Sequence, residues 1–480
     1  MASTTDRIQV PFRGAGAGDG EMTWAQVGIW QTMVRTGLSM NIGGRVVLAP
    51  GTTVDEMMVL LRFLVSRHQA LRTRLRFIPG GPPQQVVSDS GEVALEVVDL
   101  GPGDDAEAVA CGLEARYLTN PFDYPAEWPI RMGVVRRDGG LTHVVIVYCH
   151  LAVDGFGIDA IVRDMVNMDQ VTGDPTAPLT GLTPLEITAK QHTSADIRQS
   201  RKSLRHWERL VRSIPTQRFG VSDDPREPRF WELTRRSPVM HLAMQLISHR
   251  TGVGVGYVFL AAYAVALARC TGRNPSVAQL VVSNRFRPGC VDSVSQNAQL
   301  SLCAIDVADT TFDEVVARAW NAATNAYMHG YFDPLALNTM LARVATERGP
   351  VDISIIVNDR RMRNGVPPLR DLPTRDQLNA ALPRCSGWWS RQADALDAEL
   401  NISVDATPDG TAVDVKIFAD THRLSPTGIE ALALEMERTA AEAAFDAAYP
   451  TGIPPQSESR HGHDPSRHSS AIVASIRRVQ

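Results

Sequence analysis

The chain has 480 residues, of which 44% are hydrophobic and 21% are charged, and its net charge is −5. Because one hydrophobic core rarely serves more than about 250–300 residues, we expect at least two folded lobes. The small negative charge gives no electrostatic case for nucleic acid or an anionic membrane surface as a partner. Local basic runs, such as residues 198–212, are typical of a solvated helix face.

Six cysteines lie scattered along the chain, and none of them belongs to a Cys-x-x-Cys pair. Six are too few to cross-link a chain of this length, so we expect reduced thiols and a cytoplasmic location. The first residues hold no apolar stretch of signal-peptide length, and no run approaches about 18 apolar residues. The sequence therefore predicts a soluble protein.

The first part of the chain alternates helical and extended patterns. Apolar residues at three- and four-residue intervals predict helices, and alternation of apolar with polar residues predicts strands. We expect helices over 22–37, 54–67, 104–118 and 158–168, and strands over 41–50, 71–77, 93–98, 130–136 and 143–148. Asp138-Gly139-Gly140 separates the last two strands and predicts a hairpin turn.

A stretch rich in Gly, Pro and Thr, residues 172–184, predicts a domain boundary. Beyond it we expect helices over 185–213, 240–250, 258–270, 312–329 and 425–444, and strands over 278–283, 300–307, 351–357, 399–404 and 412–418. The predicted fold class is α/β, with one lobe over residues 1–184 and a second over 185–450. Residues 451–480, rich in Ser, His, Pro and Arg, predict a flexible tail.

Several familiar site patterns are absent or poorly matched. Residues 251–256 read TGVGVG, but no strand precedes them, so a helix end and a linker explain them better than a nucleotide-binding loop. The chain has no Gly-x-Ser-x-Gly and no His-Glu-x-x-His. A zinc site built from Cys149, His150 and Asp154 would need further ligands that the spacing does not supply. We therefore expect no metal site.

One stretch, VVIVYCHLAVDGFGIDAIV at residues 144–162, stands out. Apolar and aromatic residues run into Cys149-His150, three small apolar residues follow, and Asp154 then precedes Gly155. A histidine at the end of a buried strand is more often structural than catalytic. Periodicity alone leaves two readings open, a core strand with a polar end or an active-site loop that holds one imidazole.

The sequence His150-x-x-x-Asp154-Gly155 resembles the His-His-x-x-x-Asp-Gly motif of condensation domains from nonribosomal peptide synthetases. Five other segments resemble that family in the same order: 22–30 (MTWAQVGIW), 67–73 (RHQALRT), 120–131 (NPFDYPAEWPIR), 260–272 (LAAYAVALARCTG) and Asn284-Arg285. The resemblance spans about residues 20–445. It implies two lobes like chloramphenicol acetyltransferase, arranged as a V-shaped pseudo-dimer with a tunnel between them.

The resemblance also implies roles for five residues. His150 would lie mid-tunnel and act as base or proton shuttle, since an imidazole titrates near neutral pH. Asp154 would form a structural ion pair with Arg285, and Gly155 would give the backbone room near the substrate path. Cys149 replaces the first motif histidine, and we favour packing over a nucleophilic role for it. A second departure, residues 295–301 (SQNAQLS), leaves the tunnel floor and the acceptor open.

The family resemblance implies an acyltransferase that forms an amide or ester in natural-product biosynthesis, including antibiotic biosynthesis. The donor would be an acyl thioester on the phosphopantetheine arm of a carrier protein supplied in trans, because we see no room for an adenylation domain and expect a free-standing enzyme. The acceptor would be a small amine or alcohol, free or carrier-bound. No intrinsic cofactor is expected. Two alternatives stay open: acyl-coenzyme A as donor, and a non-catalytic condensation-like module that recruits partners.

Overall fold

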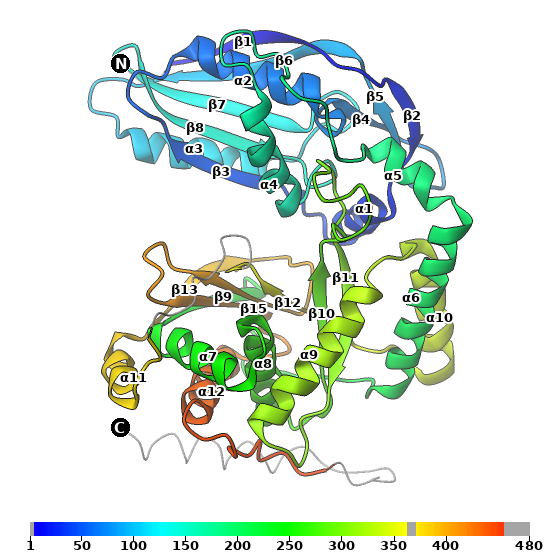
Figure 1. Ribbon diagram of the computed structural model, residues 1–480, viewed down its shortest axis with the longest axis vertical. Coiled ribbons are helices and arrows are strands. Elements are labelled where there is room, and N and C mark those ends of the chain that lie inside the picture. Colours follow the sequence, from blue (N-terminus) through cyan, green and yellow to red (C-terminus); the bar gives the residue numbers. More distant parts are fainter. Residues whose placement is uncertain (1–3, 362–370, 456–480) are drawn as a thin grey trace.

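The computed structural model describes residues 4–361 and 371–455. They form two lobes that meet at one side and diverge at the other, so that the molecule is V-shaped in Figure 1. Strands and helices occur in both lobes, which confirms the predicted α/β class. Helices α5 (Pro184–Gln191) and α6 (Ser194–Ser213) lead from the first lobe to the second on the closed side of the V (Figure 1).

The first lobe is built on a five-stranded sheet with the order β1-β6-β7-β8-β3 and a small sheet with the order β2-β5-β4. The strands are β1 (Thr4–Arg13), β2 (Gly18–Glu21), β3 (Ile42–Val47), β4 (Thr73–Arg76), β5 (Gln84–Val87), β6 (Ser90–Asp99), β7 (Ile130–Arg137) and β8 (Gly140–Tyr148). The helices are α1 (Trp24–Thr36), α2 (Val54–Arg67), α3 (Ala106–Thr119) and α4 (Gly155–Asp164).

Alternation along β8 shows why helices cover both faces of the larger sheet. Val144 belongs to the hydrophobic core beneath α2, whereas Val145 and Val147 belong to the core beneath α3. Successive side chains of a strand point to opposite faces, so each face of β8 receives its own apolar row. The buried strand therefore ends between two packed layers, and the residue after it is held firmly.

The second lobe is built on a seven-stranded sheet with the order β11-β10-β12-β14-β15-β9-β13. Its strands are β9 (Phe230–Ser237), β10 (Ser276–Val282), β11 (Gln299–Ile305), β12 (Ile355–Asp359), β13 (Ser386–Ala393), β14 (Leu400–Ala406) and β15 (Val413–Asp420). Its helices are α7 (Pro238–Thr251), α8 (Val255–Thr271), α9 (Phe312–Met328), α10 (Pro334–Arg348), α11 (Arg375–Ala381) and α12 (Pro426–Ala443).

Helix α8 is the centre of this lobe, because residues 258–268 are buried without a break. A helix that is apolar all round must be covered on every side, and α7, α9 and α12 pack against it. Gly252, at φ 70°, ends α7 in the left-handed conformation that favours glycine, so the TGVGVG stretch is a helix end and a linker. In the described part of the chain no single helix is long and apolar enough to span a membrane; α7 and α8 pass that test only as a pair bent by 110°.

Most predicted boundaries differ by a few residues from the observed ones, and three differences have a clear physical cause. The charged segment predicted as one helix over 185–213 forms two helices, because the Thr193 hydroxyl accepts from the Asp196 N–H at 3.3 Å and starts a new helix. The helix predicted from residue 158 begins at Gly155, since Asp154 caps it. The segment predicted as a flexible tail from residue 451 is attached to the second lobe where it begins, because the Thr451 N–H donates to the Thr310 carbonyl at 3.0 Å. Residues 456–480 of that prediction lie outside the described residues.

Candidate active site

The turn after β8 carries His150 to the space between the lobes. Tyr148 ends the strand, and the Ala152 N–H donates to the Cys149 carbonyl at 2.9 Å to form a tight turn. Leu151 and Val153 are 3% and 0% exposed, so apolar packing fixes the turn from below. His150 is half-buried, and its Nδ1 atom is buried with no hydrogen-bond partner in the described structure. The turn therefore fixes the His150 ring without a hydrogen bond to its Nδ1 atom.

The Asp154 carboxylate, in contrast, accepts hydrogen bonds from three backbone N–H groups and from Arg285. Its Oδ1 accepts from the Gly157 N–H at 2.7 Å, which caps α4. Its Oδ2 accepts from the backbone N–H groups of Asn297 and Ala298 at 2.9 and 2.8 Å. Arg285 donates to both carboxylate oxygens at 2.9 Å. Because Asp154 is 2% exposed, these donors supply the partners that a buried carboxylate requires.

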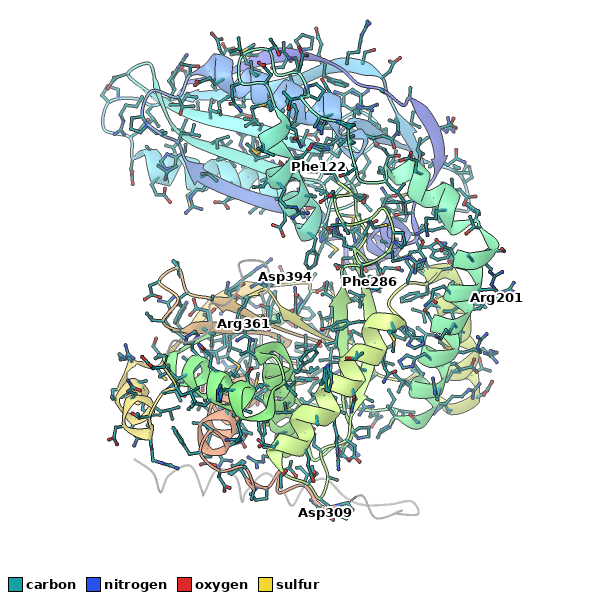
Figure 2. The ribbon with its side chains drawn as sticks, viewed as in Figure 1. Phe122, Arg201, Phe286, Asp309, Arg361 and Asp394 are labelled. Carbon is teal, nitrogen blue, oxygen red and sulfur yellow. The ribbon has the colours of Figure 1, made fainter. Side chains whose placement is uncertain are left out.

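Arg285 joins this turn to the second lobe. It is 8% exposed, and it also donates to the backbone carbonyls of Ser293 and Ser295 at 3.2 and 3.1 Å. Residues 284–299, which carry it, lie against the first lobe, and Figure 2 shows Phe286 of this segment at the junction. The pair Asp154–Arg285 thus connects residues 131 positions apart in the chain. It fixes the segment after His150 on a surface supplied by the other lobe.

Gly157 is a glycine that this packing requires. A Cβ atom at Gly157 would lie 2.4 Å from the Val153 side chain and 3.0 Å from the Ser295 carbonyl. The family resemblance implies that Gly155 gives the backbone room near the substrate path, and Gly155 lines the cavity between the lobes. Gly157 is the third residue after the aspartate, and its need for glycine depends on Val153 of the same turn and on Ser295 of the second lobe, contacts that appear only in the folded chain.

Cys149 is enclosed by apolar side chains. It is 2% exposed and packs in a cluster with Met22, Val27 and Phe122. Burial raises the pKa of the Cys149 thiol to about 12, so the nucleophilic thiolate is scarce at neutral pH. This environment favours packing over nucleophilic chemistry. Within the described residues, no three His, Cys, Asp or Glu side chains gather as a metal site would need.

A cavity of about 990 Å³ lies between the lobes and is lined by His150, Asp154 and Gly155 together with residues of α1 and of the second lobe. One part of its wall is apolar and includes Trp207, Phe219, Leu300, Phe332, Leu337 and Leu341. Another part is charged and includes Arg35, Asp352, Asp359, Arg360, Asp397, Glu399 and Arg423. A cavity of this size can hold a ligand with both an apolar body and a polar end.

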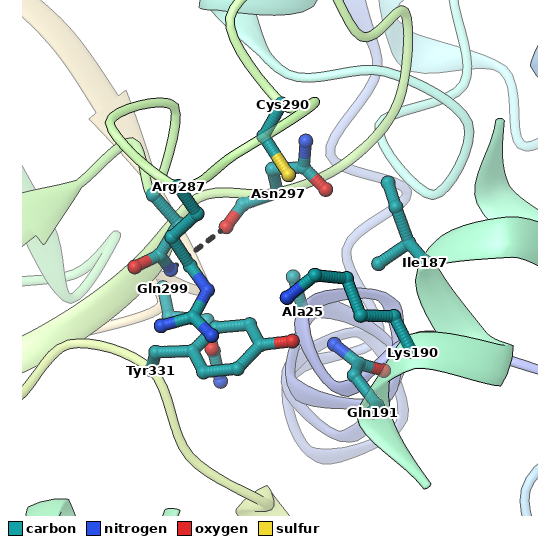
Figure 3. Close-up of a pocket in the computed structure, with 10 residues that line it drawn as sticks. Ala25, Ile187, Lys190, Gln191, Arg287, Cys290, Asn297, Gln299 and Tyr331 are labelled. Carbon is teal, nitrogen blue, oxygen red and sulfur yellow. Dashed lines mark hydrogen bonds between the residues drawn. The ribbon is translucent and has the colours of Figure 1, made fainter. Parts of the chain in front are cut away.

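A second, much smaller pocket of about 10 Å³ lies where α1, α5 and the second lobe meet. Figure 3 shows Lys190, Arg287 and Tyr331 around it. All three bond to Asp196, at 3.2, 2.7 and 2.8 Å respectively. The space suits about one water molecule, so we assign this polar cluster to holding the lobes together.

Asp397 is a cavity residue that no sequence pattern marks. It stands in the stretch LDAEL just before β14, and only the fold brings it to the cavity that His150 lines. A lone carboxylate at the start of a strand gave no signal of chemistry.

A family model of the condensation domain matches residues 20–347. The chain belongs to the condensation-domain family. The matched segment contains His150, Asp154 and Arg285, whereas Asp397 lies beyond it.

Relatives of this condensation domain include two fungal synthetases. Nonribosomal peptide synthetase kk1B of Curvularia clavata is 24% identical over 335 residues, and cyclosporin synthetase simA of Tolypocladium inflatum is 26% identical over 335 residues. Each match covers 65% of this chain but 2% of the synthetase. The chain therefore corresponds to a small part of each of these much longer proteins.

Solved structures share the whole architecture. The SgcC5 protein of Streptomyces globisporus has a TM-score of 0.67 at 18% identity, and the match covers 90% of this chain and 100% of that one. The X-domain from teicoplanin biosynthesis has a TM-score of 0.70 at 17% identity and covers 91% and 97%. The starter condensation domain of rhizomide synthetase, solved with C8-CoA, has a TM-score of 0.67 at 17% identity and covers 92% and 96%. The predicted V of two chloramphenicol-acetyltransferase-like lobes is thus confirmed.

Proposed function

We propose that this protein transfers the acyl group of a thioester to an amine or hydroxyl acceptor, forming an amide or ester and releasing a thiol. The observation that supports this most is the placement of His150. It is held by a rigid turn, it lines a cavity of about 990 Å³ between the lobes, and its Nδ1 has no partner within the described residues. A half-buried imidazole on the wall of a large cavity is available to a ligand bound there.

His150 acts as base or proton shuttle in this proposal. A thioester is already activated, so the protein contributes chiefly by aligning the two substrates and excluding water. The imidazole accepts a proton from the acceptor as the nucleophile attacks the carbonyl carbon, and the leaving thiolate then takes up a proton. Asp154 and Arg285 do not react. They hold the turn, so that the ring stays in one place during the transfer.

The donor we propose is an acyl group on the phosphopantetheine arm of a carrier protein. The relatives support this choice because they are nonribosomal peptide synthetases. Coenzyme A ends in the same pantetheine thiol, and the rhizomide synthetase starter domain has been solved with C8-CoA, so acyl-coenzyme A is the second candidate donor. Both donors deliver the same reacting bond to His150.

The test is reconstitution with purified protein. Acyl-carrier protein and acyl-coenzyme A are supplied separately, each with pools of amine and alcohol acceptors, and products are identified by mass. Product that depends on the protein and on His150 supports the proposal, and the donor that yields it identifies the partner. A folded protein that binds an acyl-carrier protein but never forms product with either donor would instead be a recruitment module.

A further inference from the structure

Asp397 belongs to the second lobe and lines the cavity. It stands just before β14, and its backbone carbonyl accepts from the Arg35 guanidinium of α1 at 3.1 Å. This bond joins the two lobes and fixes the backbone beneath the Asp397 side chain. Both Asp397 and His150 line the cavity, each supplied by a different lobe.

The carboxylates of the cavity wall differ in how their charge is balanced. Three of them have an arginine partner: Asp154 with Arg285 at 2.9 Å, Asp359 with Arg361 at 2.7 Å, and Glu399 with Arg423 at 3.4 Å. A fourth, Asp352, hydrogen-bonds to Glu399 and accepts from the Ser354 N–H at 3.1 Å. Among the described residues, neither Asp352 nor Asp397 has a basic side chain within 4.0 Å of its carboxylate. Asp397 differs from Asp352 because it is not bonded to another carboxyl group of the wall either.

The surroundings of Asp397 favour the binding of a positively charged ligand. Its carboxylate accepts a hydrogen bond from the Asn401 side chain, and burial raises its pKa above the ordinary value. The Asn401 hydrogen bond and the positive charges of Arg35 and His150 act in the opposite direction. Burial makes the charged carboxylate unfavourable, and within the described part of the chain no close ion pair offsets this cost; a positively charged ligand would do so.

We propose that Asp397 binds the protonated amine of the acceptor and presents its nitrogen to His150, so that the product is an amide. This inference rests on the proposed function and deepens it. The ammonium nitrogen gives one proton to the imidazole and attacks the thioester carbonyl carbon. A C–N bond forms as the C–S bond breaks, and the thiolate takes a proton from the imidazolium. The nitrogen loses its second proton to water, so one proton is released per amide.

The experiment compares two probes with the same carbon skeleton, 2-phenylethylammonium and 2-phenylethanol. Their affinities are measured by calorimetry for the wild type, for Asp397→Asn and for Asp394→Asn. The third protein is a matched control, because Asp394 is exposed and lies only three residues away. We expect the wild type and the control to prefer the ammonium probe by about tenfold or more, which is the scale of a hydrogen bond to a charged group. Asp397→Asn should lose this preference and keep its affinity for the alcohol.

Two outcomes would overturn the assignment of Asp397: equal affinity of the wild type for the two probes, or an unchanged preference in Asp397→Asn. Turnover distinguishes this failure from a failure of the proposed function. If the wild type acylates 2-phenylethylamine or 2-phenylethanol from an acyl-N-acetylcysteamine thioester, and Asp397→Asn gives the same ratio of amide to ester, the acyl transfer is supported and the amine site is rejected. If the preference for the ammonium probe depends on Asp397 but no acceptor is ever acylated, the amine-binding role of Asp397 is supported and the acyl-transfer function is rejected.

Discussion

His150 and Asp154 lie four residues apart on one turn, yet their side chains differ in burial and in hydrogen bonding. Asp154 accepts from three backbone N–H groups and from Arg285, and almost none of its surface is exposed. His150 stays half-buried beside a large cavity, and within the described residues its Nδ1 has no partner. A satisfied buried group stabilises a fold, whereas a half-buried imidazole on a cavity wall is available to a ligand. The two residues should therefore fail differently when they are replaced.

The largest expected effect is on catalysis in His150→Ala. General-base contributions are typically about 10²–10⁴-fold, and we expect a loss of product formation in that range with little change in unfolding free energy. A hydroxyl acceptor, which needs proton removal to become nucleophilic, would place the loss near the upper end. His192→Ala is the control, since His192 is an exposed histidine. If His150→Ala turns over like the wild type, the catalytic role proposed for His150 is wrong.

The next effect is on stability, in Asp154→Ala and Arg285→Ala. Removing one partner leaves the other as an uncompensated buried charge, which costs about 3–5 kcal/mol. Urea unfolding should show this loss in each single variant, together with lower activity because the turn is released. The double variant should lose less than the sum of the single losses. Strictly additive losses would mean that the ion pair does not couple the lobes.

Local signals predicted most elements of the fold, and non-local contacts explain what they missed. The helix over 54–67 was predicted with its observed bounds from its apolar spacing, and the structure shows that Thr53 caps it. Strand β1 was missed, since it is a sheet edge with exposed polar side chains and with Pro11, and only pairing with β6 makes it a strand. Helix α10 was missed as well, although Asp333 and Pro334 mark its start.

The same distinction applies to the site. The stretch around His150 and Asp154 drew attention because a buried strand ended in polar residues, and the family resemblance supplied Arg285. Asp397 had no such signal, because its meaning depends on which charged residues of other elements approach its carboxylate. A sequence reveals the residues of one turn, whereas the balance of charge across a cavity appears only after folding.

A pair of stacked histidines should make the protein sensitive to acid. The rings of His206 and His329 lie 4.2 Å apart at 10°, next to Arg209 and Lys202. Burial and the neighbouring positive charges lower both pKa values, that of His206 to about 4. The folded state therefore prefers neutral rings, so their stabilising effect is complete above pH 6.5 and is lost as the pH falls towards 4.

Urea unfolding at pH 7.5, 5.5 and 4.5 checks this, with His329→Gln as the comparison. Other groups also titrate in this range, so the informative quantity is the difference between the two proteins. The wild type should lose more stability than His329→Gln as the pH falls, because the variant removes one of the two facing charges. Parallel loss in both proteins would show that the histidine pair is not a source of acid sensitivity.

The smallest effect should come from Cys149, which sits beside His150 but belongs with the satisfied, structural residues. With a thiol pKa of about 12, about one molecule in 10⁴ carries the thiolate at pH 8, and burial blocks access as well. Cys111 is exposed on α3 and provides a control within the same molecule. We expect iodoacetamide to label Cys111 quickly and Cys149 slowly, and Cys149→Ser to keep activity within about tenfold while losing about 1–3 kcal/mol for the buried hydroxyl. Labelling of Cys149 at the rate of Cys111, with inactivation in step, would assign the chemistry to the thiol and leave His150 as its base.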